Sequence, residues 1–262
     1  MPTADVDGFS IHYREYGEPD SPPLFLVHGL YGDSSSMVSL ATALSVRFRT
    51  ITPDMLGHGR SARPAEFTLT DQGRVLNALV QHLGYETAAV LGVSMGSYVA
   101  AQAAILDPAR TSRLVLVVPK AHGRTSSTMA YAQRIGVDLA ALTPEAALDV
   151  LSKALWSPAT PQHRRDEILA TATEQVVLGP AEQAAIERSL AGFDLRPGLG
   201  SITAPTLVVS GRSDGLNPPE AGEEVARHIP NARFVVYERS GHLLAAEETE
   251  RLVADTVAFV LS

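Results

Sequence analysis

The stretch LGVSMGSYVAAQ, residues 91–102, places one serine between two glycines, where an apolar run ends and an alanine-rich stretch begins. The run AAVLGV predicts a buried strand, and MGSYVAAQAAIL predicts a helix that begins directly after Ser94. Such a sharp turn from strand to helix forces its central residue into a strained backbone conformation and brings neighbouring backbones close together. Glycine at positions 92 and 96 relieves that crowding. The stretch therefore predicts that Ser94 is a nucleophile projecting above the carboxyl end of a sheet, rather than an ordinary turn residue.

Short apolar runs alternate with helical patterns along most of the chain, which is typical of a parallel sheet with crossover helices. Runs such as LFLVHG and TLVVSG are apolar almost throughout, as expected of strands that are covered on both faces. The fold class is therefore α/β. We expect strands at about 9–16, 23–28, 48–53, 87–93, 113–118, 205–210 and 233–237. We expect helices near 35–46, 70–83, 95–106, 220–228 and 247–260.

The alternation stops between about 119 and 200, where no convincing strand pattern occurs. Helical segments near 144–156, 161–178 and 180–192 begin at proline or Thr-Pro signals. This stretch is too apolar to be a solvated linker, so it is interpreted as an insertion at one end of the sheet. The sequence thus predicts a core domain of residues 1–118 and 201–262 and a helical cap of residues 119–200.

Composition excludes several classes of function. A formal net charge of −8, without any cluster of Lys and Arg, argues against nucleic acid as a partner. The absence of cysteine excludes disulfides, thiolate metal sites and a cysteine nucleophile. The N-terminal residues lack a basic start followed by an apolar core, and the longest apolar runs have only the length of a strand. We therefore expect no membrane association and a cytoplasmic location.

A serine hydroxyl needs a base to become a good nucleophile, and the best candidate is His242. The stretch YERSGHLLAAEE places His242 in a loop between the last strand and the last helix. This loop follows the carboxyl end of a strand, where open parallel sheets build their sites. Other histidines are interpreted as surface residues on an early strand or on polar helices: His12, His82, His163 and His228.

The carboxylate that orients the base is assigned to Asp214. The stretch TLVVSGRSDGLNPPE places Asp214 just after a buried strand. The alternative position, the end of the strand RLVLVV, is followed by PKAH and offers no carboxylate. The resulting order along the chain is serine, aspartate, histidine, as expected of this sheet topology.

The oxyanion of an acyl-transfer reaction needs two fixed hydrogen-bond donors. One is expected to be the backbone N–H of Met95, at the start of the helix after Ser94. The other is expected in VHGLYG, where the N–H of Leu30 is the first choice and that of Tyr31 the second. His28 in the same loop is expected to order the loop rather than to catalyse.

These motifs together resemble those of the α/β-hydrolase superfamily, over essentially the whole chain. The matching stretches are, in order, HGLYG, PDMLGHGRS, GVSMGS, APTLVVSGRSDGLNPP and SGHLLAAEE. The resemblance implies an eight-stranded, mostly parallel sheet flanked by helices, an α-helical cap and a Ser-His-Asp triad. It implies a structural role near the site entrance for the loop that carries Asp54, His58 and Arg60. A serine nucleophile speaks against the haloalkane dehalogenases and epoxide hydrolases of the superfamily.

With this triad we expect hydrolysis of a small or medium carboxylic ester, or of a lactone, through an acyl-enzyme. No cofactor and no metal are expected, and a small-molecule ester is the expected partner of a monomer or homodimer. Lys120 and His122 are near the expected entrance and could help to bind a carboxylate. Substrate-binding candidates are Tyr31 and, in the cap, Met129, Tyr131, Leu155, Trp156 and Phe193.

Two alternatives remain open at this point. The same triad could serve a C–C bond hydrolase or a cofactor-free perhydrolase, and identification of the released product would separate these reactions. The chain could instead be a small-molecule receptor on the α/β-hydrolase fold. Slow single-turnover acylation, tight ligand binding and a partner protein would favour a receptor.

Overall fold

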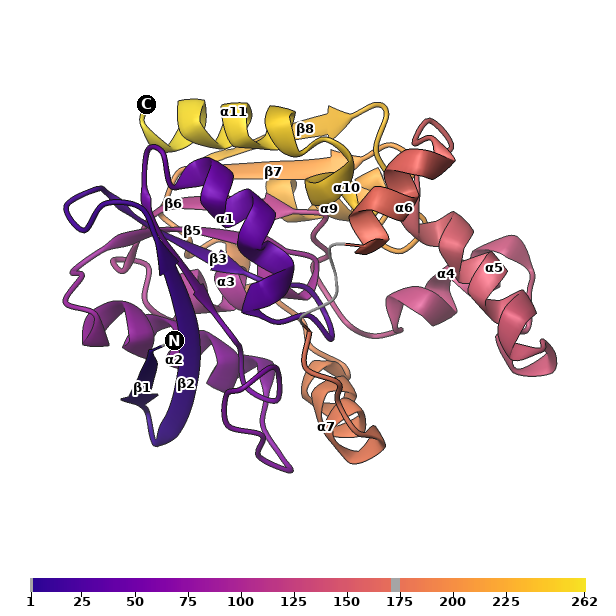
Figure 1. The fold of residues 1–262 in the computed structure, drawn as a ribbon, viewed down its shortest axis with the longest axis horizontal. Helices are drawn as coiled ribbons and strands as arrows, with labels where there is room; N and C mark the ends of the chain where they lie inside the picture. The colour runs from indigo at the N-terminus through magenta and orange to yellow at the C-terminus, as the bar shows by residue number, and fades with distance from the viewer. Residues whose placement is uncertain (1, 171–174) are drawn as a thin grey trace.

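The structure, a computed structural model, describes residues 2–170 and 175–262. In this part of the chain an eight-stranded sheet runs in the order β1-β2-β4-β3-β5-β6-β7-β8 and forms the centre of the molecule (Figure 1). The strands are β1 (Thr3–Val6), β2 (Phe9–Tyr16), β3 (Pro23–Val27), β4 (Arg49–Pro53), β5 (Ala88–Val93), β6 (Thr111–Val117), β7 (Thr206–Gly211) and β8 (Ala232–Tyr237).

The sheet is mostly parallel. Only the β1–β2 and β2–β4 pairs of the described strands are antiparallel, and every other neighbouring pair is parallel. The prediction of an eight-stranded, mostly parallel sheet in an α/β fold is therefore confirmed. The sequence patterns miss β1, because its four residues TADV are too few for a periodic signal.

Helices cover both faces of the sheet. Alternation along β3 shows the two layers: Phe25 and Val27 belong to the buried cluster that includes α2, α3 and α9, whereas Leu24 and Leu26 belong to the cluster that includes α1 and α11. All four side chains are fully buried. The long helices of these layers are α1 (Val38–Leu44), α2 (Leu69–His82), α3 (Met95–Leu106), α9 (Pro219–His228) and α11 (Thr249–Val260). Shorter turns are η1 (Ser34–Met37), η2 (Leu139–Ala141), α8 (Arg196–Leu199) and α10 (Leu244–Glu247).

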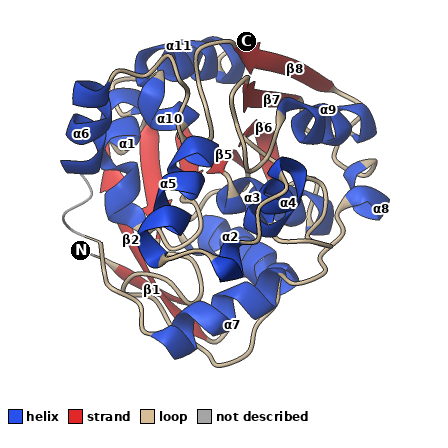
Figure 2. Cartoon of the chain, turned by 90° about the vertical axis from the view of Figure 1, so that its right-hand side faces the viewer, coloured by secondary structure: helices blue, strands red, loops and turns tan. Residues whose placement is uncertain are grey.

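The insertion, residues 119–200, lies between β6 and β7 in the chain. Figure 1 shows α4, α5 and α6 beyond the end of the sheet to which the β7 and β8 arrows point, whereas α7 lies below the sheet in that view. The helices α4 and α5 lie in front of the strands in Figure 2. The helices are α4 (Ser127–Ile135), α5 (Pro144–Leu155), α6 (Gln162–Ala170) and α7 (Pro180–Leu190). The division of the chain into a core and a cap stays a prediction.

Two helices of the insertion differ from the sequence interpretation. The helix α4 was not predicted from the sequence. It begins after Ser126, whose side chain accepts the N–H of Met129. The predicted helix over 161–178 is wrong at its end. Residues 171–174 lie outside the described residues. The helix α6 reaches Ala170, and residues 175–178 are not helical. There the Val176 N–H donates to the Asp33 carboxylate at 2.9 Å instead of continuing a helix.

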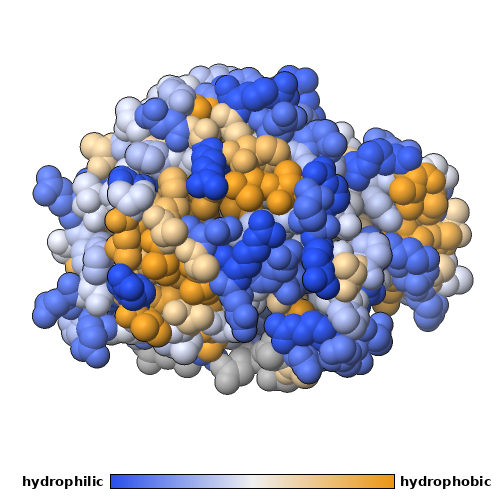
Figure 3. Space-filling model, turned by 90° about the horizontal axis from the view of Figure 1, so that it is seen from above, coloured by the Kyte–Doolittle hydropathy of each residue, from blue (hydrophilic) through white to orange (hydrophobic). Residues whose placement is uncertain are grey.

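The surface of the insertion carries exposed apolar side chains. Figure 3 shows apolar atoms gathered in the middle of one face and again at the end of the molecule where the insertion lies. Leu148 on α5 is 68% exposed and Met129 on α4 is 50% exposed. Among the described residues, no helix combines the length and apolar character needed to cross a membrane.

Candidate active site

Ser94 lies at a sharp turn between β5 and α3, in a backbone conformation with φ 53° and ψ −116°. Residues other than glycine rarely adopt a positive φ, so this conformation is strained. A Cβ at Gly92 would overlap the carbonyl oxygen of Gly96, and a Cβ at Gly96 would overlap that of Val27. Both glycines are therefore needed for α3 to begin so close to β3.

The structure brings the side chains of Ser94, His242 and Asp214 into one hydrogen-bonded chain. The Ser94 Oγ lies 2.9 Å from the His242 Nε2, and the His242 Nδ1 lies 2.9 Å from the Asp214 Oδ2. The side chain of Asp214 is fully buried and that of His242 is 9% exposed. Because a carboxylate only accepts hydrogen bonds, the Nδ1 carries the proton, and the Nε2 is free to accept from the serine hydroxyl.

Backbone groups hold the two partners of Ser94 in place. The Asp214 Oδ1 accepts the N–H groups of Leu216 and Asn217, each at 2.8 Å, which leaves the Oδ2 for the histidine. In the histidine loop, the Gly241 N–H donates to the Glu247 carboxylate at 2.6 Å. The orientation of the imidazole thus depends on fixed contacts on both sides.

The predicted oxyanion donors lie on the two segments that meet at Ser94. Met95 is the first residue of α3, so its N–H has no acceptor within the helix. The loop after β3 passes the serine closely, since a Cβ at Gly29 would lie 3.7 Å from the Ser94 Cβ. Neither the Leu30 nor the Met95 N–H has a hydrogen-bond acceptor among the described residues. Tyr31, the second choice, has a φ of 60°.

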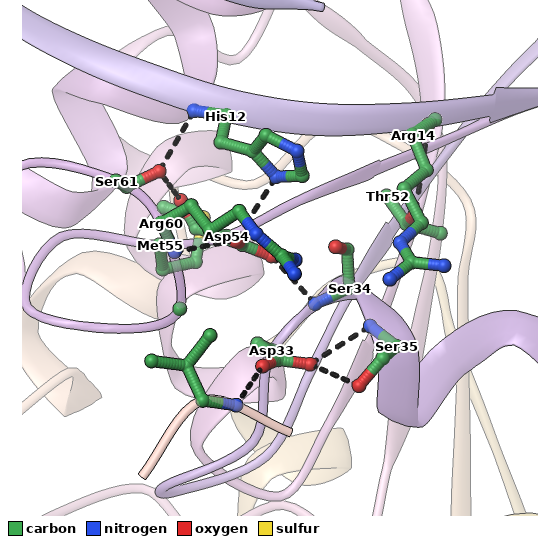
Figure 4. Close-up of polar contacts among 12 residues, drawn as sticks. His12, Arg14, Asp33, Ser34, Ser35, Thr52, Asp54, Met55, Arg60 and Ser61 are labelled. Carbon is green, nitrogen blue, oxygen red and sulfur yellow. Dashed lines mark hydrogen bonds and ion pairs between the residues drawn. The ribbon is translucent and has the colours of Figure 1, made fainter. Parts of the chain in front are cut away.

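A buried polar network supports the loop after β3 (Figure 4). At its centre, the fully buried Asp54 carboxylate accepts the N–H of Ser34 at 2.6 Å and that of Arg60 at 2.8 Å. The Ser61 hydroxyl donates to the Asp54 carbonyl oxygen at 2.6 Å. The PDMLGHGRS loop therefore holds the start of η1, which agrees with the structural role implied by the resemblance.

His12 belongs to the same network, so its interpretation as a surface residue is wrong. It is 4% exposed, and its Nδ1 lies 3.0 Å from the Asp54 Oδ2. The loop that carries Asp54 and Ser61 covers this position of β2, and the buried ring is retained because the carboxylate partners it. The other three histidines interpreted in this way are exposed: His82, His163 and His228.

His28 is held as a neutral ring inside the loop. Its Nδ1 donates to the Gly29 carbonyl oxygen at 2.8 Å, and its Nε2 accepts the Met55 N–H at 3.1 Å. Burial lowers its pKa. With both ring nitrogens occupied by backbone groups, His28 has no nitrogen free to take a proton from a substrate.

Asp33 connects the loop to the insertion. One carboxylate oxygen accepts the Ser35 N–H at 2.8 Å, and the other accepts the Val176 N–H at 2.9 Å. Burial by itself would raise the pKa of Asp33, but these hydrogen bonds and that of the Ser35 hydroxyl outweigh it and lower the pKa. The aspartate is therefore stabilised as an anion that fixes both segments.

The predicted pocket residues lie in different environments. Phe193 stacks on Tyr98, with ring centroids 5.0 Å apart, and Tyr31 donates to the Glu187 carboxylate of α7 at 2.5 Å. Tyr131 lies beside Gly215, next to Asp214. Trp156 is 5% exposed and its backbone packs on the histidine loop, whereas Met129 is half exposed.

The side chains of Tyr98 and Asn217 also lie at the site, although neither residue was among the predicted site residues. The Asn217 side-chain amide donates to the Tyr98 hydroxyl oxygen at 2.6 Å and to the Val118 carbonyl oxygen at 2.8 Å. Burial raises the pKa of Tyr98, while contacts with the side chains of Asn217 and Ser94 act against that rise. The spacing of Tyr98, four residues and about one helical turn after Ser94, is the signal that could have found it.

Within the described residues, no group of three or more His, Asp or Glu side chains is arranged to hold a metal ion.

Gly96→Ala tests the close approach at the turn. We expect it to lower the free energy of unfolding by about 3 kcal/mol, because the added methyl group meets backbone atoms of Val27 and His28 that cannot move independently. Urea denaturation measures the change. Gly200→Ala is the matched control, since Gly200 has a φ of −67° and only a distant neighbour for a Cβ. Equal losses of unfolding free energy in the two variants would show that the close backbone approach at Gly96 does not require glycine.

Asp54→Asn tests the buried network. An amide offers one acceptor oxygen where the carboxylate offers two, so at least one buried N–H loses its partner. We expect a loss of about 3 kcal/mol in the free energy of unfolding, measured by urea denaturation. The exposed Asp5→Asn on β1 should change it by less than about 0.5 kcal/mol. A similarly small change at Asp54 would show that the network is not required.

Comparison with known proteins shows which chains this one is similar to. The chain is 28% identical over 249 residues to the "Putative carbamate hydrolase RutD" of Stutzerimonas stutzeri, with 92% of each chain covered. It is 28% identical over 247 residues to the pimeloyl-(acyl-carrier protein) methyl ester esterase of Nitrosomonas europaea, covering 89% of this chain and 92% of that one. The structure of the enol-lactonase from Burkholderia xenovorans LB400 superimposes with a TM-score of 0.85 at 25% identity, over 100% of both chains.

A family model described as the alpha/beta hydrolase fold matches residues 22–249, which is most of the chain. That range begins just before β3 and ends where α11 begins, so it contains Ser94, Asp214 and His242. The protein therefore belongs to the α/β-hydrolase fold family and is a hydrolase.

Proposed function

We propose that this hydrolase cleaves a small or medium carboxylic ester, or a lactone, through an acyl-enzyme formed on Ser94. The observation that carries the proposal is the chain of hydrogen bonds from Ser94 through His242 to Asp214, 2.9 Å at each link. Such a chain lets the serine hydroxyl lose its proton as it attacks a carbonyl carbon.

In the first half of the reaction, the Ser94 Oγ forms a bond to the acyl carbon while the His242 Nε2 takes the hydroxyl proton. Asp214 keeps the imidazole in the required tautomer and stabilises its charged form. The N–H groups of Met95 and Leu30 stabilise the oxyanion that develops on the carbonyl oxygen. The bond to the alcohol oxygen then breaks, and the alcohol leaves with the proton from His242.

In the second half, water attacks the acyl-enzyme and gives its proton to His242. The bond between the acyl carbon and the Ser94 Oγ breaks, and the serine regains its proton from the imidazole. The sum of both halves is ester plus water giving acid plus alcohol. For a lactone, acid and alcohol stay in one molecule.

Both the relatives and the surroundings of the serine support this substrate class. Two of the similar proteins carry the names methyl ester esterase and enol-lactonase. Phe193 lies next to the Tyr98 ring, and Tyr131 and Trp156 lie near Asp214 and the histidine loop, so all three are proposed to contact the substrate. Tyr31 and Met129 are proposed for the outer part of the pocket.

Ser94→Ala tests the nucleophile. We expect the wild-type protein to turn over p-nitrophenyl esters repeatedly, with an optimum between acetate and decanoate that reports the size of the pocket. The variant should lose at least about 10³-fold in kcat. Ser201→Ala, an exposed serine in the turn after α8, is the control. Retention of activity in the Ser94 variant would refute the acyl-enzyme, and a single slow turnover by the wild type would favour a receptor.

Asp214→Asn tests the role of the carboxylate. If the side-chain oxygen keeps the N–H groups of Leu216 and Asn217, the new NH₂ group faces the His242 Nδ1 and forces the wrong tautomer. We expect kcat to fall by about 10⁴-fold with little change in KM. Steady-state kinetics with the preferred ester measure both constants. A loss expressed only in KM would contradict an orienting role.

A further inference from the structure

Lys120 occupies an unusual position for an ammonium group. It follows β6 by three residues, after Val118, which has a φ of 47°. Its Nζ lies 5.8 Å from the ring centroid of Tyr98 and 5.9 Å from that of Phe193. The two rings stack on each other at 5.0 Å with an interplanar angle of 29°. The cation therefore lies against an aromatic pair rather than in bulk water.

The ammonium lacks a matching anion. An ammonium has three N–H donors, and the Nζ has one long hydrogen bond, of 3.4 Å, to the Thr125 carbonyl oxygen. Among the described residues, no carboxylate lies within 4.0 Å of it. Burial lowers the pKa of Lys120 to about 8, with no opposing contribution from a neighbouring anion. A partly buried cation without a counter-ion is costly, and an anionic ligand would offset that cost.

The second lysine of the chain, Lys153, lies in a different environment from Lys120. The sequence contains only two lysines, Lys120 and Lys153. Lys153 is exposed on α5 and pairs with Asp149 at 2.7 Å. The hydrogen bond to Asp149 raises its pKa, which is the usual behaviour of a paired surface lysine. Lys120 differs from it in burial, in pairing and in the direction of the pKa change.

Tyr98 connects the ammonium to the nucleophile. The Lys120 Nζ lies over its ring, and the Ser94 side chain acts to lower the pKa of its hydroxyl. Asn217 fixes the hydroxyl by a 2.6 Å hydrogen bond. Asn217 is itself held by Asp214, whose Oδ1 accepts its N–H at 2.8 Å. One rigid side chain therefore separates the ammonium from the reacting oxygen.

Backbone hydrogen bonds fix the position of Phe193, the second aromatic residue beside Lys120. The Gly123 N–H donates to the Phe193 carbonyl oxygen at 2.7 Å, and the Leu195 N–H donates to that of Ala121 at 2.9 Å. The two ends of the insertion are thus joined next to Lys120. A Cβ at Gly123 would meet the Phe193 ring, so the close pairing of the two segments needs glycine. Phe193 is consequently held against the ammonium and the tyrosine.

We propose that the Lys120 ammonium binds a carboxylate of the substrate, so that the preferred substrates are half-esters of dicarboxylic acids, or lactones that carry a carboxylate. The inference rests on the proposed function, because it takes the scissile carbonyl to lie at Ser94. The carboxylate then lies at the Lys120 ammonium while the scissile carbonyl lies at Ser94. The formal net charge of −8 does not favour an anionic substrate, so a local cation is needed to attract its carboxylate.

The test compares a charged and an uncharged ester on the same protein preparation. Hydrolysis of monomethyl adipate and of dimethyl adipate is followed by proton release at pH 7, where the ammonium form of Lys120 predominates. A charge-assisted hydrogen bond should favour the monoester in kcat/KM by about 10-fold to 100-fold. Lys120→Met keeps the aliphatic stem but removes the charge, and it should reduce that preference by about tenfold or more. Lys153→Met, which removes the exposed lysine, should leave the preference unchanged.

A preference for the dimethyl ester in the wild type, or an equal preference in wild type and Lys120→Met, would overturn the inference while the esterase function stands. Because the readout is a ratio of two rates, a partly unfolded variant does not imitate the expected result.

A binding measurement separates this inference from the proposed function. The two lysines are dimethylated with ¹³C-formaldehyde, which keeps their charge, and monomethyl adipate is added to the Ser94→Ala protein. The Lys120 resonance should shift while that of Lys153 stays in place. If no ester is hydrolysed by the wild type but this shift occurs, the proposed function fails and the carboxylate site stands. If the Lys120 resonance does not shift, the carboxylate site is refuted.

Discussion

The strained turn at Ser94 is the constraint on which the site depends. Its positive φ of 53° directs the chain from β5 into α3 without an intervening loop, and this is possible only because Gly92 and Gly96 leave room for neighbouring carbonyl groups. The parallel sheet then brings the loops after β7 and β8 to the same edge, with Asp214 and His242. Packing on both faces holds this edge in place, so the free energy of the core is what maintains the strain.

A second constraint is the polar network beneath the loop after β3. Burying the Asp54 carboxylate and the His28 ring is unfavourable without hydrogen-bond partners, and the backbone N–H groups of Ser34, Arg60 and Met55 supply such partners. The network fixes the loop that carries the Leu30 N–H. Asp33 links this loop to the insertion, because its carboxylate accepts the N–H of Val176. The proposed oxyanion site would therefore depend on buried polar groups as well as on apolar packing.

Local signals were sufficient to predict every described strand except β1, and the turn at Ser94, because apolar runs and glycine spacing are local properties. Contacts between distant segments left no such signal. No sequence pattern indicated that His12 would meet Asp54 or that Tyr98 would meet Asn217. The helix α4 was missed because its start depends on one capping hydroxyl, that of Ser126. The position of Lys120 against Tyr98 and Phe193 likewise follows only from tertiary structure.

The central claim is that the folded protein activates Ser94 as a nucleophile. Reaction with a fluorophosphonate, followed by intact mass and peptide mapping, tests this claim independently of the choice of substrate. The account predicts one adduct, on Ser94, which forms on the native protein and is lost when the protein is unfolded beforehand. Absence of an adduct on the native protein, or modification of a different residue, would contradict it.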